Sequence, residues 1–203
     1  MFVVGIVGRV GAGKSTVARR LAERGAEVVD ADLLAHEVLD EPSVRQAIAT
    51  RFGGDVLDAA GRVNRPVLAA RVFGPDRAAD LAALEAIVHP GVRRRIEARL
   101  DRLRGSDSVV VLDVPLLVQV GLDAICDRLL VITCDDAVRH ARLAARGWSA
   151  EQIAARDAAW SRGLPRGEPA PGKSDSVDTG DGLSYTLDHV DRLWSDWRRL
   201  AAS

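Results

Sequence analysis

Short apolar runs alternate along the chain with stretches in which apolar residues recur at helical spacing. The runs cover residues 2–7, 26–30, 108–113 and 128–133, and most are rich in valine and isoleucine. Continuous runs of this length are typical of strands buried on both faces, as in a parallel sheet. A glycine turn and a helical pattern separate the first run from the second, which makes a βαβ unit. The pattern therefore predicts an α/β fold with a parallel sheet.

The longest stretch without a predicted strand lies between the second and third runs. Its apolar residues follow a helical period, most clearly over residues 76–104, where Pro90 should bend or divide the helix. We expect this stretch, residues 33–105, to form an inserted helical subdomain. The remaining residues, 1–32 and 106–203, would then form the sheet-containing core.

The last third of the chain is mostly helical in pattern, with one irregular segment. Residues 135–146, 149–162 and 183–200 are predicted helices, and residues 163–174, rich in glycine and proline, are a predicted loop. The segment that follows has one sizeable apolar residue, Val177, so no buried strand is predicted there.

Composition and charge narrow the classes of function. The net charge is −1 and aromatic residues make up 4% of the chain, which argues against a nucleic-acid-binding or membrane-binding surface. No apolar run is long enough to span a membrane. The two cysteines, Cys126 and Cys134, have no CxxC spacing and are expected to be reduced and buried. These features favour a cytoplasmic protein; they leave its oligomeric state open.

A glycine-rich segment after the first predicted strand carries the clearest chemical signal. It matches the pattern GxxxxGK[ST] and reads Gly8-Arg9-Val10-Gly11-Ala12-Gly13-Lys14-Ser15, followed by Thr16. Glycines let backbone N–H groups turn inward around phosphate oxygens, and the helix that follows points its N-terminus at the same anion. Lys14 would bind the β- and γ-phosphates, and the Ser15 hydroxyl would hold Mg²⁺. The alternative is a strand-to-helix turn without a ligand.

Two carboxylates at strand ends fit phosphoryl transfer. Asp32 follows the second predicted strand, and the carboxyl ends of parallel strands border the ligand crevice. Asp32 could orient or deprotonate an attacking hydroxyl, or it could cap the helix that follows. Asp113 ends the third predicted strand and could reach Mg²⁺, or it could be satisfied by backbone N–H groups of its loop.

Five segments together resemble the dephospho-CoA kinase family. In chain order they read GIVGRVGAGKST, VVDADLLAHEV, FGGDVLDAAGRVNRPVLAARVF, LEAIVHPGVRRRI and VVLDVPLLVQVGL. The resemblance runs from residue 1 to about residue 147. It implies a P-loop kinase-type three-layer fold, in which the helical subdomain binds the acceptor and residues 139–175 or thereabouts form a lid. It also implies transfer of the ATP γ-phosphate to the ribose 3′-hydroxyl of dephospho-CoA, with Mg²⁺.

The resemblance also assigns roles to individual residues. Asp32 matches the family's proposed base, and Lys14 and Arg142 complete the implied catalytic set. The phosphate loop and Arg146 would bind the nucleotide, with the two arginines closing from the lid. The implied acceptor contacts are His89, Arg93, Asp113 and Leu117. His89 could instead bond a carbonyl freed by Pro90, and in an arginine-rich chain Arg142 and Arg146 could form a solvated face.

The match weakens after Gly147. Asp157 stands where the family usually has isoleucine, and residues 174–180 lack the asparagine that the family uses beside adenine. Two other functions therefore stay open. One is a P-loop kinase of another small hydroxyl substrate, such as a nucleoside, and the other is a non-catalytic nucleotide-binding relative.

Overall fold

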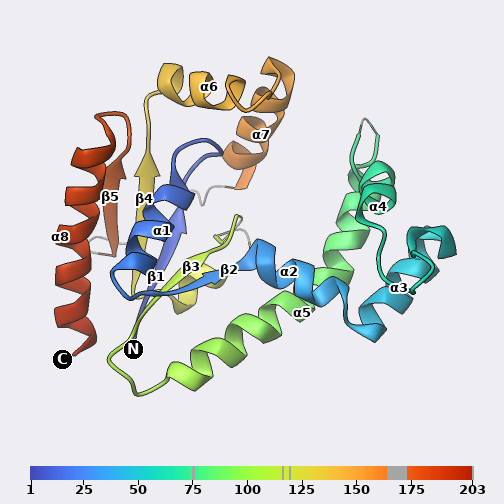
Figure 1. Ribbon diagram of the computed structural model, residues 1–203, viewed down its shortest axis with the longest axis horizontal. Coiled ribbons are helices and arrows are strands. Elements are labelled where there is room, and N and C mark those ends of the chain that lie inside the picture. The colour runs from blue at the N-terminus through green and yellow to red at the C-terminus, as the bar shows by residue number, and fades with distance from the viewer. Residues whose placement is uncertain (75, 116, 119, 164–172, 203) are drawn as a thin grey trace. The chain divides into compact units, whose positions relative to one another are not determined.

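A five-stranded parallel sheet forms the core of one part of the chain in this computed structural model (Figure 1). The structure describes residues 1–203 except 75, 116, 119, 164–172 and 203. The strands are β1 (Phe2–Val7), β2 (Glu27–Asp30), β3 (Val109–Asp113), β4 (Arg128–Thr133) and β5 (Ser174–Asp178), in the order β2-β3-β1-β4-β5. The predicted α/β fold with a parallel sheet is confirmed.

The chain divides into two compact units, which are described separately. Residues 1–30 and 103–203 form the first unit, which contains the sheet, and residues 31–102 form the second, which is helical. The division falls within a few residues of the boundaries expected from the sequence, at 32/33 and 105/106.

Two helices cover one face of the sheet in the first unit. They are α1 (Lys14–Glu23) and α8 (Leu183–Ala201), and they lie side by side (Figure 1). The core between them and the strands includes Val4, Ile6 and Leu21, with Trp197 of α8 only 1% exposed. The indole of Trp197 donates to Asp175 of β5 at 3.0 Å, so this large side chain is buried with its polar atom satisfied. The same unit holds η2 (Leu122–Ile125), α6 (Asp136–Ala144) and α7 (Ala150–Gly163).

The prediction of no strand over residues 174–180 is wrong. Strand β5 pairs with β4 through the register Leu129–Ser174 to Thr133–Asp178. It is an edge strand, and Val177 alone among its residues is fully buried. An edge strand needs few apolar residues because only part of it faces the core. The remaining stabilisation comes from the backbone hydrogen bonds to the neighbouring strand. The predicted loop at 163–174 lies largely outside the described residues.

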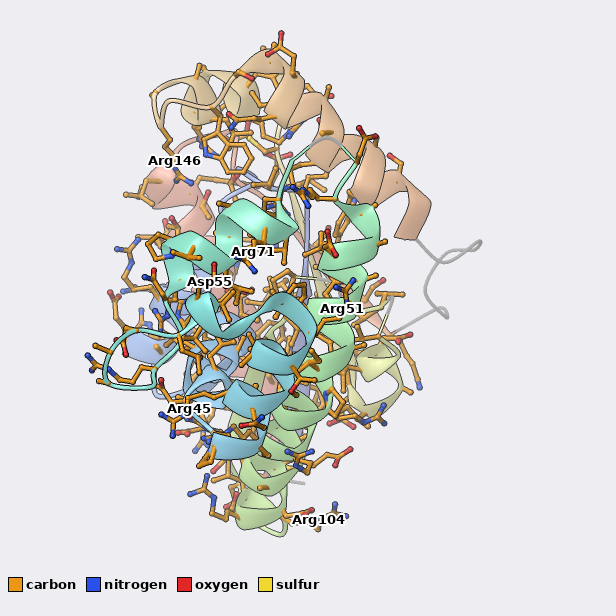
Figure 2. The ribbon with its side chains drawn as sticks, turned by 90° about the vertical axis from the view of Figure 1, so that its right-hand side faces the viewer. Arg45, Arg51, Asp55, Arg71, Arg104 and Arg146 are labelled. Atoms are coloured by element: carbon orange, nitrogen blue, oxygen red, sulfur yellow. The ribbon has the colours of Figure 1, made fainter. Side chains whose placement is uncertain are left out.

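The second unit is a set of short helices packed along one long helix. The elements are α2 (Ala31–Leu39), α3 (Pro42–Phe52), η1 (Gly54–Val56), α4 (Arg65–Val72) and α5 (Ala78–Leu103). Asp55 of η1 and Arg71 of α4 point toward each other and form an ion pair (Figure 2). Pro90 lies inside α5, which is continuous and bends partway along (Figure 1).

Candidate functional site

The phosphate loop connects β1 to α1, as the sequence predicts. Gly11 and Gly13 have φ angles of 80° and 98°, which side-chain-bearing residues rarely adopt. Gly8 has a different constraint, since a Cβ there would lie 2.8 Å from the carbonyl oxygen of Ile132. Each of these glycines is therefore required by the shape of the loop or by its closeness to β4.

Lys14 folds back over the loop from the first turn of α1. Its Nζ donates to the carbonyl oxygens of Gly8 at 2.7 Å and of Arg9 at 3.2 Å. The ammonium therefore lies over the same loop whose backbone N–H groups would bind phosphate. Ser15 is exposed and Thr16 is half-buried in the same turn.

Two of the predicted arginines border a pocket beside the loop. The pocket has a volume of about 270 Å³ and is lined by Gly11, Gly13, Thr16, Arg142, Arg146, Thr179, Leu183 and Thr186. Arg142 lies in the last turn of α6 and is half-buried, whereas Arg146, labelled in Figure 2, follows that helix and is exposed. The structure therefore brings the loop and both arginines to one site.

Arg142 is not part of a solvated arginine face. Its guanidinium donates to the hydroxyl oxygen of Thr179 at 3.0 Å, to the carbonyl oxygen of Thr179 at 2.6 Å and to the sulfur of Cys134 at 3.4 Å. These partners come from the segments that follow β4 and β5, so the carboxyl ends of two strands hold the guanidinium at the pocket.

Asp113 lies at the carboxyl end of β3, which pairs with the strand that leads into the phosphate loop. Its register partners are Ile6 of β1 and Asp30 of β2. The carboxylate is half-buried. This placement agrees with the predicted position of Asp113 at the ligand edge of the sheet.

The donor atoms present suit magnesium held mainly through a nucleotide. Within the described part of the chain, no group of three or more His, Cys, Asp and Glu side chains could hold a metal ion by itself. Mg²⁺ often takes only one or two protein oxygens and completes its shell with phosphates and water. The hydroxyl of Ser15 and the carboxylate of Asp113 are oxygen donors of this kind.

Three predicted site residues belong to the helical unit. Asp32 lies in the first turn of α2 and is exposed. α2 begins at Ala31, so Asp32 lies inside its first turn and not at the N-cap position before Leu33. His89 and Arg93 lie one turn apart on α5, both exposed, and Arg93 donates to Glu97 at 3.0 Å.

Leu117 does not reach the surface. It is 1% exposed, and a Cβ added to Gly5 of β1 would lie 2.9 Å from its side chain and 2.9 Å from the sulfur of Cys126. This position in the core favours a packing role over the predicted contact with an acceptor. Cys126 is 7% exposed, and burial raises the pKa of its thiol to about 12.

Two residues outside the predicted set also contact the site. Thr179, the residue after β5, is 5% exposed and bonds both the phosphate loop and Arg142. Arg139 is 1% exposed and donates to the carbonyl oxygen of Val10 in the loop at 3.2 Å. Arg139 lies one helical turn before Arg142, a spacing that could have indicated a shared face.

Comparisons with known proteins point to one family. A family model described as dephospho-CoA kinase matches residues 2–162. A dephospho-CoA kinase from Thiobacillus denitrificans is 40% identical over 100% of this chain and 98% of its own length. One from Methylococcus capsulatus is 44% identical over 76% of this chain and 77% of its own.

Solved structures show the same fold. A crystal structure of a Thermus thermophilus protein has a TM-score of 0.72 and 30% identity, covering 96% of this chain and 97% of its own. A dephospho-CoA kinase from Campylobacter jejuni has a TM-score of 0.65 at 21% identity, covering 96% of each chain, which supports the fold alone. With a family model spanning most of its residues and relatives matched along its length, the chain belongs to the dephospho-CoA kinase family.

Proposed function

We propose that this chain transfers the γ-phosphate of ATP to the ribose 3′-hydroxyl of dephospho-CoA. The observation that carries the proposal is the phosphate loop, in which Lys14 lies over the loop carbonyls and the adjoining pocket is lined by Arg142 and Arg146. Membership of the dephospho-CoA kinase family supports the choice of acceptor.

In this proposal the triphosphate lies on the loop and the nucleoside occupies the adjoining pocket. Backbone N–H groups of the loop (Gly8, Gly11, Ala12, Gly13) and of the first turn of α1 (Ser15, Thr16) bind the phosphate oxygens. Lys14 leaves the loop carbonyls for the β- and γ-phosphates. Arg142 and Arg146 supply forked donors that neutralise charge on the transferred group.

The acceptor is activated by a carboxylate. Asp32 accepts the proton of the 3′-hydroxyl as that oxygen forms its bond to the γ-phosphorus. The bond from the γ-phosphorus to the β–γ bridging oxygen breaks, and ADP leaves with the electron pair. His89 and Arg93, exposed on α5, bind the acceptor, and Arg93 suits its phosphates.

The proposed reaction also uses Mg²⁺, for which the chain would supply two ligands. Ser15 and Asp113 would hold the ion, directly or through water. When bound, Mg²⁺ neutralises charge on the β- and γ-phosphates.

The same proposal includes a cytoplasmic location and no nucleic-acid or membrane partner. Its support is that both cysteines are unbridged and buried, which suits a reducing compartment. Among the described helices, none has the length and apolar character needed to cross a bilayer.

Coupled ADP release tests the proposal with dephospho-CoA and a panel of nucleosides as acceptors. We expect ATP- and Mg²⁺-dependent turnover with dephospho-CoA that exceeds turnover with every nucleoside. Preference for a nucleoside would indicate a kinase of another hydroxyl substrate. ATP binding in calorimetry without turnover of any acceptor would indicate a non-catalytic relative.

A further inference from the structure

Thr179 is the point at which the phosphate loop, strand β4 and Arg142 are joined. Its hydroxyl oxygen lies 2.7 Å from the carbonyl oxygen of Ala12 and 3.3 Å from that of Thr133. The backbone N–H of Thr179 donates to the same Thr133 carbonyl at 3.0 Å. A hydroxyl has one proton to donate, and the shorter distance assigns it to Ala12.

The hydroxyl also accepts a hydrogen bond while it donates one. Arg142 Nη1 donates to it at 3.0 Å, and Arg142 Nη2 donates to the carbonyl oxygen of Thr179 at 2.6 Å. A single buried hydroxyl thus connects a peptide of the phosphate loop to the guanidinium of Arg142. Thr179 is 5% exposed, so water offers little replacement for either bond.

The bond to Ala12 fixes more than one carbonyl. The peptide unit that joins Ala12 to Gly13 is planar and trans, so its C=O and N–H point in opposite directions. While the Ala12 carbonyl is held toward Thr179, the N–H of Gly13 points away from Thr179. Gly13 has a φ of 98°, and as a glycine it would tolerate other orientations of the Ala12–Gly13 peptide. The hydrogen bond from the Thr179 hydroxyl to the Ala12 carbonyl oxygen selects one of these orientations.

The methyl group of Thr179 has a separate role. A Cβ added at Gly13 would lie 3.2 Å from the Thr179 methyl carbon, so this methyl packs directly against the loop. The side chain therefore makes two kinds of contact with one loop, a hydrogen bond and a packing contact. These contacts can be removed one at a time.

We infer that Thr179 is a positioning residue for ATP, which orients the Ala12–Gly13 peptide and holds Arg142 at the same pocket. The inference rests on the proposed function for the identity of the reaction. The hydroxyl carries the effect, and the methyl contributes packing. Thr179 acts through the loop N–H group and the guanidinium.

Matched substitutions test this inference in the full-length protein. Thr179→Val keeps the methyl and removes the hydroxyl, whereas Thr179→Ser keeps the hydroxyl and removes the methyl. We expect Thr179→Val to raise the Kd for ATP in calorimetry and the KM for ATP by about tenfold, the change produced by losing a buried hydrogen bond. In Thr179→Val the KM for dephospho-CoA should change less than about twofold. In Thr179→Ser the Kd and KM for ATP should stay within about threefold of those of the unchanged protein.

Other outcomes would overturn the inference. They are unchanged ATP binding in Thr179→Val, or an effect in Thr179→Ser as large as that in Thr179→Val. If Thr179→Val does not fold, Thr179→Ala against Thr179→Ser makes the same comparison of hydroxyl loss. Because ATP binding is measured directly, the inference stands or falls separately from the proposed acceptor, which turnover alone tests.

Discussion

Arg139 of α6 binds Asp157 of α7 through nitrogen–oxygen contacts of 2.5 and 3.0 Å, although only 1% of the arginine side chain is exposed. The same guanidinium donates to the carbonyl of Val10 in the phosphate loop and to Asp136, which in turn binds Arg9. Asp157 thus supplies the carboxylate partner that a buried guanidinium at position 139 needs.

A double-mutant cycle on this pair should show strong coupling. We expect Arg139→Met and Asp157→Ile each to lower the free energy of unfolding by about 2 kcal/mol, because each removes one partner of a largely buried charged pair. The double variant should lose less than the sum, since neither charge remains. Urea denaturation measures all four proteins. Losses that add within about 0.5 kcal/mol would show that the two residues act independently.

Asp191 predicts how stability depends on pH. The carboxylate of this α8 residue accepts hydrogen bonds from Arg24, which directly follows α1, and from Arg20 of α1. These two arginines hold the pKa of the Asp191 carboxyl well below its usual range. A lowered pKa in the folded state means that the unfolded chain binds the proton more readily. The stabilisation is therefore present above the ordinary Asp pKa of about 3.9 and is lost as the pH falls below it.

The measurement compares thermal midpoints of the unchanged protein and Asp191→Asn. At about pH 7 the variant should melt at a lower temperature, and the difference should shrink progressively below about pH 4. The hydroxyl of Ser195 donates to the backbone carbonyl oxygen of Asp191, not to its carboxylate. Ser195→Ala therefore changes a neighbouring hydrogen bond without changing the charge, and it serves as a local control. A gap that stays constant between about pH 7 and pH 3 would contradict this assignment.

Gly91 is required by helix packing. A Cβ at this position of α5 would lie 2.6 Å from a methyl carbon of Val38 in α2, too close for real atoms. Gly91→Ala should therefore destabilise the protein by about 1–3 kcal/mol. In an exposed helix the same change would stabilise by up to about 1 kcal/mol.

Gly54 provides the matched control. A Cβ added there meets nothing within 4 Å, and its φ is not positive. Gly54→Ala should leave the free energy of unfolding within about 0.5 kcal/mol of its starting value. If both substitutions behave alike in chemical denaturation, the close packing of α5 on α2 is wrong.

Asp32→Asn separates binding from chemistry. An amide of the same shape cannot take the proton of the acceptor hydroxyl, so kcat should fall at least about a hundredfold. The Kd for ATP should stay within about twofold, because Asp32 is not part of the phosphate loop. Initial rates and calorimetry on the same preparation give both quantities. An unchanged kcat would remove Asp32 as the base.

The sequence was sufficient for the features that depend on local patterns. Strands β1 to β4 are short apolar runs, and the phosphate loop is a contiguous motif, so both are visible without a structure. The helix expected to follow Asp32 begins at Ala31 in the structure, a small difference that is typical of helix ends.

The features that were missed depend on neighbours distant in sequence. Strand β5 is stabilised by its ladder with β4 and by the packing of α8, neither of which appears in its own five residues. Thr179 and Arg139 are ordinary residues until folding brings them to the loop carbonyls of Ala12 and Val10. Leu117 resembled a site residue by motif, whereas its burial is a property of the assembled core.

The identity and position of the phosphorylated product test the central claim most directly. The purified protein is incubated with ATP, Mg²⁺ and dephospho-CoA, and the product is analysed by mass spectrometry and by phosphorus NMR. The account predicts one added phosphoryl group, on the ribose 3′-oxygen, and its loss in Lys14→Ala, whose fold is checked by circular dichroism. An unmodified acceptor in the presence of bound ATP, or equal product from Lys14→Ala, would contradict it.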